Sequence, residues 1–418
     1  MTTTAAGICL GLLVLLAVQA FLVWRFIAAL AAPAPPPLAD DDCPHATVIL
    51  CLRGLDPFLD RCVAATLDQD YPRFDVRIVV DHQDDPTLGA VRNWLASHPF
   101  PNVRVELLEE RRDTCSLKCS SLTQTVGRLG PEVEFIAQLD ADTIPHRGWL
   151  RELATALADP AVGAATGNRW YAPATANWGS LVRYLWNAAA VVQMYWYQIA
   201  WGGTLAVKTK VIREAGLLQS WQNSLCEDTM LYSKLRSKGY RLRFVPSLMM
   251  VNRESCDVRS FTRWVTRQLL TARLYHPGWI AVVGHALLTT VVPILAAIWA
   301  AWQFGHGAIG ETGACLLCLG IYQLLLFPLI AWMERCMRVL ARRRGESLGE
   351  WNPGLLLKLW AAVLLTQAVY SRAILQALLL RRIEWRGVEY RIGGPWKIEM
   401  IAYQPYVSSQ PTESRESL

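Results

Sequence analysis

The stretch FIAQLDADT, residues 135–143, decides the fold class of this chain. Its first five residues are mostly apolar and predict a buried strand, and Asp140, Ala141 and Asp142 follow without a break. Two carboxylates one residue apart at a strand end are hard oxygen ligands that can share one divalent cation. Such a cation neutralises a diphosphate in phosphoryl chemistry. The alternative is an ordinary acidic loop, and the position directly after the apolar strand favours the metal site.

The residues around this stretch predict an α/β domain over residues 34–275. Apolar strand-like runs such as ATVILCL (46–52) and DVRIVV (75–80) alternate with longer helix-like segments. Alternation of this kind is typical of a largely parallel sheet covered by helices. In open sheets of this type, ligands bind outside the carboxyl ends of the strands. The predicted site therefore lies at that edge.

Apolar segments flank this domain. Residues 7–24 carry no charge and are long enough to span a bilayer. MTTTAA, the start of the chain, has no Lys or Arg, which favours an uncleaved anchor with its linker (1–33) over a signal peptide. Residues 278–303 and 314–333 predict two more spans within a region 276–333. The link between them has no Lys or Arg and the link after them has five Arg, so the α/β domain is expected in the cytosol.

The last region, 334–418, is expected to hold a basic loop, an apolar helix at 354–380 and a W-R-G-x-x-Y-R tail. One pass of the helix would place the basic tail outside, against the positive-inside rule. Two passes need about 40 residues, more than the segment has. An interfacial or re-entrant helix is therefore favoured over a full span, although both remain open.

Composition supports a membrane protein with one soluble domain. The chain has 418 residues, of which 53% are apolar and 18% charged, and this excludes intrinsic disorder. Residues 34–275 hold 27 basic and 26 acidic residues, so nearly all of the net charge of +6 lies in and beside the membrane segments. That placement indicates topology and anionic headgroups, and it gives no support for nucleic-acid binding. The 11 scattered Cys fit free thiols in a reducing compartment.

Two more acidic motifs have a functional and a structural interpretation. In VRIVVDHQDDP (76–86), Asp84 and Asp85 would accept hydrogen bonds from a nucleotide, or they would form a polar turn with a helix cap before Pro86. In LCEDTM (225–230), Asp228 would be a general base with Glu227 beside it. The alternative for this pair is a favourable acidic start of a helix.

Two helical segments are candidates for contact with the membrane. The first, at about 258–275, has the amphipathic pattern of an interfacial helix, and its Arg263 and Trp264 would also contact a diphosphate and a sugar or base. The second, YLWNAAAVVQMYWYQIAWGG (184–203), is rich in Tyr and Trp. It would lie at headgroup level and guide a lipid acceptor, or form an aromatic core helix.

Taken in order, these motifs resemble the family 2 inverting glycosyltransferases with a GT-A (Rossmann-like nucleotide-sugar) fold, and most of all their ceramide glucosyltransferase-like branch. The segments that carry the resemblance are LRGLDPFL (52–59), LDQDYPRFDVRIVVDHQDDP (67–86), SLKCSSL with Lys118, WGGTLAVKTKVIREAGL (201–217), CEDTMLYSKLRSKGYRLRF (226–244) and IEWRGVEYRIGG (383–394).

The resemblance implies a role for each matching residue. The metal, Mg²⁺ or Mn²⁺, would be held by Asp140 and Asp142, and the base would be Asp228 with Glu227. The nucleotide-sugar ligands would be Arg53, Asp84, Asp85, Lys118, Asp140, Arg263 and Trp264. The acceptor side would be formed by Trp201, Gly202, Gly203 and Thr204.

Two positions depart from the family pattern. Ser260 stands where the family has Gln or Arg before Arg263, so Arg259 or Arg267 would have to replace that grip on the diphosphate. The full D-A-D at 140–142, in place of D-S-G, is closer to bacterial relatives with other lipid acceptors.

The expected function is inverting transfer of a hexose from a nucleotide sugar, with UDP as the expected nucleotide, to the hydroxyl of a membrane lipid such as ceramide, diacylglycerol or hopanoid. The alternatives are a processive polysaccharide synthase of the cellulose or hyaluronan type and a catalytically dead scaffold or lipid-binding protein. The expected location is a bacterial inner membrane, and the expected partners are donor, lipid and bilayer.

Overall fold

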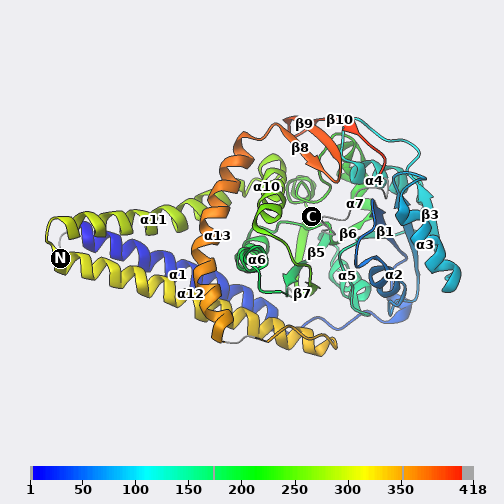
Figure 1. The fold of residues 1–418 in the computed structure, drawn as a ribbon. Coiled ribbons are helices and arrows are strands. Elements are labelled where there is room, and N and C mark those ends of the chain that lie inside the picture. Colours follow the sequence, from blue (N-terminus) through cyan, green and yellow to red (C-terminus); the bar gives the residue numbers. More distant parts are fainter. Residues whose placement is uncertain (1–2, 173–174, 351–352, 407–418) are drawn as a thin grey trace.

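The computed structural model describes residues 3–172, 175–350 and 353–406. Its centre is a seven-stranded sheet in the order β3-β2-β1-β4-β6-β5-β7 (Figure 1). The strands are β1 (Ala46–Leu52), β2 (Phe74–Val80), β3 (Val103–Leu107), β4 (Phe135–Leu139), β5 (Val162–Tyr171), β6 (Thr204–Lys208) and β7 (Arg241–Asn252). All pairings are parallel except those of β6, which runs antiparallel to β4 and β5. The predicted α/β fold with a largely parallel sheet is confirmed.

Helices cover both faces of the sheet because its strands are apolar on both sides. On β1, Val48 and Leu50 face one core and Ile49 faces the other, as the two-residue period of a strand requires. The first core is closed by α2 (Leu59–Leu67), α3 (Pro86–Ser97) and α5 (Trp149–Leu157). The second is closed by α4 (Leu117–Gly127), α7 (Thr209–Glu214), α8 (Leu217–Trp221) and α9 (Leu231–Arg236).

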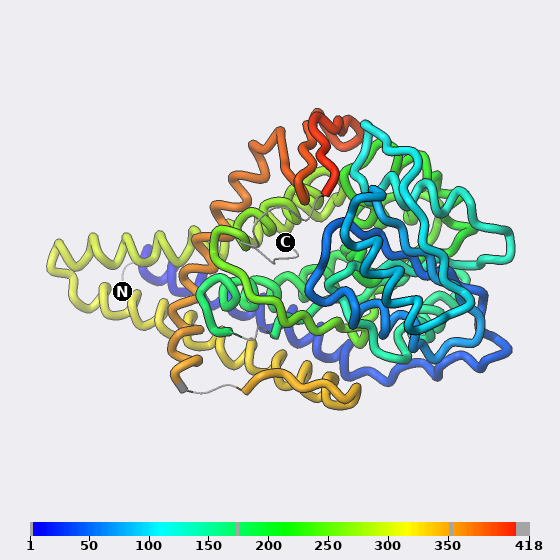
Figure 2. Tube along the Cα trace, turned by 45° about the vertical axis from the view of Figure 1, so that its right-hand side comes forward, coloured from blue at the N-terminus to red at the C-terminus, as the bar shows by residue number. Residues whose placement is uncertain are grey.

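Three long apolar helices form a bundle that projects from this domain: α1 (Thr3–Ala31), α11 (Trp279–Gly305) and α12 (Ile309–Arg343) (Figures 1 and 2). Each is long and apolar enough to cross a membrane, and so is the stretch Gly354–Leu379. These helices include the three predicted spans. The segment predicted as a basic loop from residue 334 differs, because α12 remains helical up to Arg343.

The helix α13 (Pro353–Leu379) lies across the bundle rather than along it (Figures 1 and 2). The chain before α13 is bonded to the sheet domain, with Arg344 Nη2 lying 3.0 Å from Glu152 Oε1. The chain after α13 is bonded to the same domain, since Arg386 Nη1 donates to Arg53 O at 2.5 Å. Both ends of α13 therefore meet one side of the molecule.

Helices α6 (Trp178–Tyr197) and α10 (Val258–Tyr275) pack with α13 between the sheet and the bundle. Their shared apolar core includes Val182, Phe261, Trp264 and Val369. Buried hydrogen bonds connect the bundle to the sheet domain. Glu334 of α12 accepts one from Trp170 Nε1 and one from Tyr184 Oη, each at 2.9 Å.

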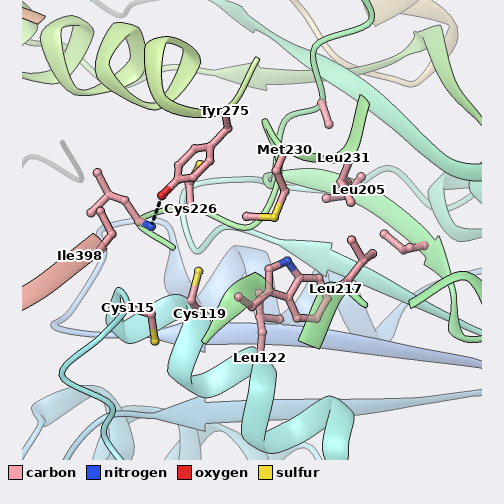
Figure 3. Packing of buried hydrophobic residues seen from close by; sticks show 14 of the residues in the cluster. Cys115, Cys119, Leu122, Leu205, Leu217, Cys226, Met230, Leu231, Tyr275 and Ile398 are labelled. Carbon is pink, nitrogen blue, oxygen red and sulfur yellow. Dashed lines mark hydrogen bonds between the residues drawn. The ribbon is translucent and has the colours of Figure 1, made fainter. Parts of the chain in front are cut away.

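The C-terminal strands β8 (Arg382–Trp385), β9 (Val388–Gly394) and β10 (Lys397–Tyr403) form a separate antiparallel sheet. Its apolar face belongs to the second core, where Ile398 lies with Cys115 and Tyr275 (Figure 3). The hydroxyl of Tyr275 accepts a 2.8 Å hydrogen bond from Leu225 N in the same region. The C-terminal sheet is therefore an integral part of the domain, although the four helices α10 to α13 separate it from the seven-stranded sheet in sequence.

Candidate active site

Two cavities lie at the carboxyl edge of the sheet and meet there. One, the polar cavity, has a volume of about 140 Å³ and is lined by residues of the sheet domain, α10 and the C-terminal sheet, eight of which are charged. The other, the apolar cavity, has a volume of about 270 Å³ and is lined by α1, α6, α10, α11, α12 and α13. Arg169, Trp264 and Gln268 line both cavities. These three side chains would therefore border a molecule bound in either cavity.

Lys118 bridges two of the predicted acidic residues on the wall of the polar cavity. Its ammonium nitrogen lies 2.6 Å from Asp140 Oδ1 and 2.7 Å from Glu227 Oε1. Burial by itself lowers the pKa of Lys118, but these two carboxylates overcome it and raise the pKa well above its usual value. Burial raises the pKa of Asp140, and Lys118 and Arg169 outweigh burial, so the net shift is downward. Lys118 and Asp140 therefore form a fixed ion pair.

Glu227 and Asp142 differ from Asp140, because burial dominates in both. Burial raises the pKa of Glu227 to about 7, against the attraction of Lys118. Burial likewise raises the pKa of Asp142 to about 7, with Arg169 opposing it and the charge of Asp140 adding to it. The Asp142 carboxylate is held by Asn252 Nδ2 at 3.3 Å and faces Arg169 Nη1 at 3.8 Å.

Asp228 faces the apolar cavity. Its Oδ2 accepts a hydrogen bond from Gly202 N at 2.9 Å and its Oδ1 accepts one from Thr229 N at 2.6 Å. These two backbone donors fix the plane of the carboxylate. Glu227 is nearly fully buried behind Lys118 and lines neither cavity. The two adjacent acids therefore point in different directions.

The predicted acceptor-side loop packs tightly around these acids. A Cβ on Gly202 would lie 1.9 Å from Glu227 Oε1 and 3.0 Å from Lys118 Nζ, so any larger residue would displace the Glu227 carboxylate. Trp201 lines the apolar cavity, and its buried indole N–H has no hydrogen-bond partner among the described residues. Thr204 lies behind the loop and accepts a hydrogen bond from Trp149 Nε1 at 2.7 Å. Trp201, although 6% exposed, can thus contact a ligand in the apolar cavity, whereas Thr204 is a packing residue.

The acidic turn after β2 is arranged differently from the prediction. Asp84 is exposed beside His82, and Asp85 caps α3 by accepting hydrogen bonds from Gly54 N at 2.8 Å and Thr87 N at 2.9 Å. Neither residue lines the polar cavity. The carboxylate that does so is Asp81, which is bonded to Arg53. The sequence interpretation of Asp85 as a helix cap fits this geometry, because Pro86 starts α3 directly after it.

Of the predicted pair Arg263 and Trp264 on α10, only one residue lines the site. Trp264 lines both cavities, whereas Arg263 is exposed and bonds Ser260 Oγ at 3.3 Å. Arg267, one turn further along, lines the polar cavity, and its guanidinium lies 4.5 Å from the centre of the Trp385 ring. Among the described residues its side chain has no hydrogen bond or ion pair. Of the two replacements for the missing Gln or Arg, Arg267 is the one that reaches the site.

Two arginines that the sequence interpretation missed also line the polar cavity. Arg169 lies at the end of β5 and stacks 4.2 Å from the centre of the Trp201 ring. Arg386 comes from the C-terminal sheet. The signal for Arg169 in the sequence was its position in a mostly apolar strand, because a buried charged side chain needs a partner or a ligand. The signal for Arg386 was the W-R-G motif itself.

Asp140 and Asp142 fit a divalent cation that is shared with a ligand. No group of three or more His, Cys, Asp or Glu side chains that would hold a metal occurs in the described residues. Mg²⁺ is commonly bound by one or two carboxylates together with substrate phosphates. Burial, and to a smaller extent the charge of Asp140, raises the pKa of Asp142, and a bound cation would favour its charged form. Two carboxylates and a diphosphate form a suitable set.

A largely parallel sheet with one reversed strand, ending in paired carboxylates beside a basic cavity, defines the class of GT-A type glycosyltransferase folds. The chain belongs to glycosyl transferase family 21, whose sequence model matches residues 3–397. The predicted likeness to the ceramide glucosyltransferase branch is confirmed by relatives of that description. Membership of family 2 stays a prediction, since the matching family is numbered 21.

The curated relatives match over limited segments. A ceramide glucosyltransferase of Pyricularia oryzae is 29% identical over 121 residues, which are 28% of this chain and 24% of the relative. One of Komagataella phaffii is 30% identical over 59 residues, which are 14% and 12% of the two chains. One of Gibberella zeae is 32% identical over 82 residues, which are 19% and 16%. The matches thus span a quarter or less of the length of these relatives.

A solved structure shares the fold. The mannosyltransferase PcManGT from Pyrobaculum calidifontis, in complex with GDP-Man and Mn²⁺, aligns with a TM-score of 0.50 and 20% identity. The alignment covers 90% of this chain and 99% of that chain. At this identity the likeness establishes the fold alone.

Proposed function

We propose that this protein is an inverting glycosyltransferase that moves a hexose from a nucleoside diphosphate sugar, with UDP as the nucleotide, to the hydroxyl of a membrane lipid. The observation that carries the proposal is the junction of the polar and apolar cavities at Arg169, Trp264 and Gln268. A charged donor fits the first cavity and an apolar acceptor fits the second. Their reacting ends would meet at this junction.

The donor's charge is matched by the side chains of the polar cavity. Lys118, Arg169 and Arg267 would face the diphosphate, and Arg53 and Asp81 would lie toward the nucleoside end. Asp140 and Asp142 would hold a divalent cation, Mg²⁺ or Mn²⁺, which supplies positive charge opposite the leaving diphosphate when bound. Glu227 positions Lys118 through their ion pair and does not itself touch substrate.

Asp228 is the proposed general base. Its carboxylate faces the cavity in which the lipid hydroxyl would lie, and two backbone N–H groups hold it in place. It would take the proton from the acceptor oxygen as that oxygen attacks the anomeric carbon from the face opposite the diphosphate. The attack inverts that carbon in one step, and no covalent enzyme intermediate is needed.

The membrane arrangement supports a lipid acceptor. The three helices α1, α11 and α12 would span the bilayer, and α6, α10 and α13 would lie at its surface beneath a cytosolic domain, as in a bacterial inner membrane. Because both ends of α13 contact the sheet domain, an interfacial position suits it better than a span. The apolar cavity is lined by all six helices and would let a lipid reach Asp228 from the bilayer.

Two other functions are less well supported by the structure. A polysaccharide synthase of the cellulose or hyaluronan type needs a channel for a sugar chain, whereas the cavity beside Asp228 is lined mainly by apolar side chains. A catalytically dead scaffold or lipid-binding protein would not require a glycine wedged against the Glu227–Lys118 pair.

The test is an assay of purified protein in lipid nanodiscs with Mn²⁺ or Mg²⁺, a panel of UDP- and GDP-hexoses, and ceramide, diacylglycerol or a hydroxylated hopanoid. We expect release of a nucleoside diphosphate together with a glycolipid detected by mass spectrometry. A soluble polymer would support the synthase instead. Absence of any product with every donor and acceptor would contradict an enzymatic function.

A further inference from the structure

The W-R-G motif of the C-terminal sheet forms a tight turn with an unusual residue in it. Strands β8 and β9 are joined by Arg386 and Gly387, with φ of 49° and 73°. Two-residue hairpin turns with both φ values positive normally hold Asn, Asp or Gly, because other side chains are strained there. Arg386 is one of only two non-glycine residues with positive φ in the described part of the chain. Its side chain must therefore have a use that outweighs this strain.

The turn places its side chains in the polar cavity. Trp385 and Arg386 line that cavity together with Lys118 and Asp140. The Arg386 backbone is locked to the first strand's loop, because Arg53 Nε donates to Arg386 O at 2.8 Å. The Arg386 guanidinium in turn bonds Arg53 O and lies 3.5 Å from Asp56 Oδ2. These contacts hold the guanidinium in place, and the Arg386 side chain remains 26% exposed where it lines the cavity.

Basic side chains outnumber acidic ones among the residues that line this cavity. Arg386 adds to Lys118, Arg169 and Arg267. Burial, and then repulsion from Arg386 and Arg169, lower the pKa of Arg267 to about 10. Arginines that repel one another across a cavity are stabilised by an anion between them, and a guanidinium matches the oxygens of a phosphate as a two-pronged donor.

The hairpin is rigidly fixed with respect to Lys118. Buried Val388 and Ile398 of the C-terminal sheet belong to the same core as Tyr275 of α10 (Figure 3 shows the latter two). Tyr390 Oη accepts a 3.2 Å hydrogen bond from Leu117 N, the residue before Lys118. The turn is therefore preorganised for a ligand rather than free to move.

We propose that the Trp385-Arg386-Gly387 turn is part of the donor site, in which Arg386 binds the diphosphate of the nucleotide sugar and the Trp385 ring holds Arg267 toward the same group. The inference rests on the proposed use of a nucleotide-sugar donor. It adds a ligand from a sheet that follows the membrane helices in sequence, so that the donor site is complete only after those helices have folded.

The test compares variants of the full-length protein in detergent by titration with UDP, GDP and the nucleosides uridine and guanosine. Arg386→Gly suits the positive φ of the turn and removes only the side chain. Loss of one charged hydrogen-bonding partner predicts roughly 10- to 100-fold weaker binding of the nucleoside diphosphate. Binding of the nucleoside should not change, because it carries no phosphate. Arg386→Lys should recover part of the loss, since it restores the charge without the planar fork.

Arg391→Ala is the matched control. Arg391 lies on the same hairpin outside the cavity and forms an exposed pair with Glu399 at 2.7 Å. It should bind both ligands as the wild type does. Trp385→Ala should raise the donor KM with little change in kcat. If Arg386→Gly binds nucleoside diphosphates normally, or loses nucleoside binding to the same degree, the proposal is wrong.

The outcomes also separate this inference from the proposed function. Wild-type protein that binds nucleoside diphosphates through Arg386 but transfers no hexose to any lipid would overturn the proposed reaction and leave the donor site standing. Wild-type protein that binds no nucleoside diphosphate would overturn both.

Discussion

The ammonium group of Lys118, on α4, and the carboxylate of Glu227, before α9, lie 2.7 Å apart. Lys118 lines the polar cavity, and Glu227 is buried behind it. The pair joins two elements from opposite halves of the domain. The Lys118 ammonium also lies 2.6 Å from Asp140 Oδ1. Lys118 therefore links Glu227 to Asp140, one of the two proposed ligands of the cation.

This pair predicts a pH dependence. Burial raises the pKa of Glu227 to about 7, so the carboxylate is charged above that pH and neutral below it. Neutral Glu227 no longer holds Lys118, and we expect kcat/KM to fall as the pH drops through about 7. Glu227→Gln should show reduced activity and a shallower fall in this range, since Asp142, whose pKa burial also raises to about 7, still titrates there. A wild-type profile that is flat between pH 6 and pH 8 would contradict this role.

Replacement of the proposed base should remove transfer and spare donor binding. Asp228→Asn keeps the shape and one of the two backbone hydrogen bonds, from Gly202 N or Thr229 N, but it cannot act as a base. We expect roughly a 10²- to 10⁴-fold loss of kcat, the usual contribution of a general base. Nucleoside diphosphate binding, measured by titration, should stay at the wild-type level. Asp159→Asn, which alters a surface pair with Arg241, is the control and should leave kcat unchanged.

Gly202 should not tolerate a methyl group. A Cβ there would lie 1.9 Å from Glu227 Oε1, so Gly202→Ala must displace the Glu227–Lys118 pair. We expect loss of most of the turnover. Gly284→Ala is the matched control, because nothing lies within 4 Å of its added Cβ and alanine favours the surrounding helix. Comparable activity of the two variants would show that the loop can adjust.

The hydrogen bonds of Glu334 should stabilise the packing of the bundle against the sheet domain. Glu334→Ala removes the shared acceptor of Trp170 Nε1 and Tyr184 Oη, and each buried group then costs about 1–3 kcal/mol. Thermal unfolding in detergent should show a clear loss of stability. Glu334→Gln keeps an acceptor oxygen and should lose less. Equal losses would instead assign the effect to the ion pair of Glu334 with Arg338 at 2.8 Å.

The orientation of α13 can be tested with inserted epitopes. Epitopes after Gly349 and after Gly394 flank α13, and an interfacial helix leaves both on the side of the sheet domain. An epitope after Gly307, in the turn between α11 and α12, should lie on the opposite side. Antibody access in vesicles of both orientations distinguishes the cases, and Gly349 and Gly394 on opposite sides would mean that α13 spans the bilayer.

The amino-acid sequence by itself determined those features whose physical cause is local. Apolar runs form the strands, long uncharged segments form the bundle helices, and Asp140 and Asp142 follow a strand end because the chain reaches them without a turn between. The motif order also indicated the ceramide glucosyltransferase-like relatives. These features depend on the composition and spacing of neighbouring residues, and both can be read along the chain.

Only the tertiary structure decided which residues of each motif face the cavities. Asp81 lines the polar cavity and Asp85 does not, because Asp85 is used to cap α3. Arg267 reaches the cavity and Arg263 does not, because one helical turn moves a side chain about 5.4 Å along the axis. Arg386 joins the site from a sheet beyond the membrane helices. Contacts of this kind depend on where distant elements pack. The W-R-G motif marked Arg386 as notable in the sequence, but it could not say which cavity the side chain lines.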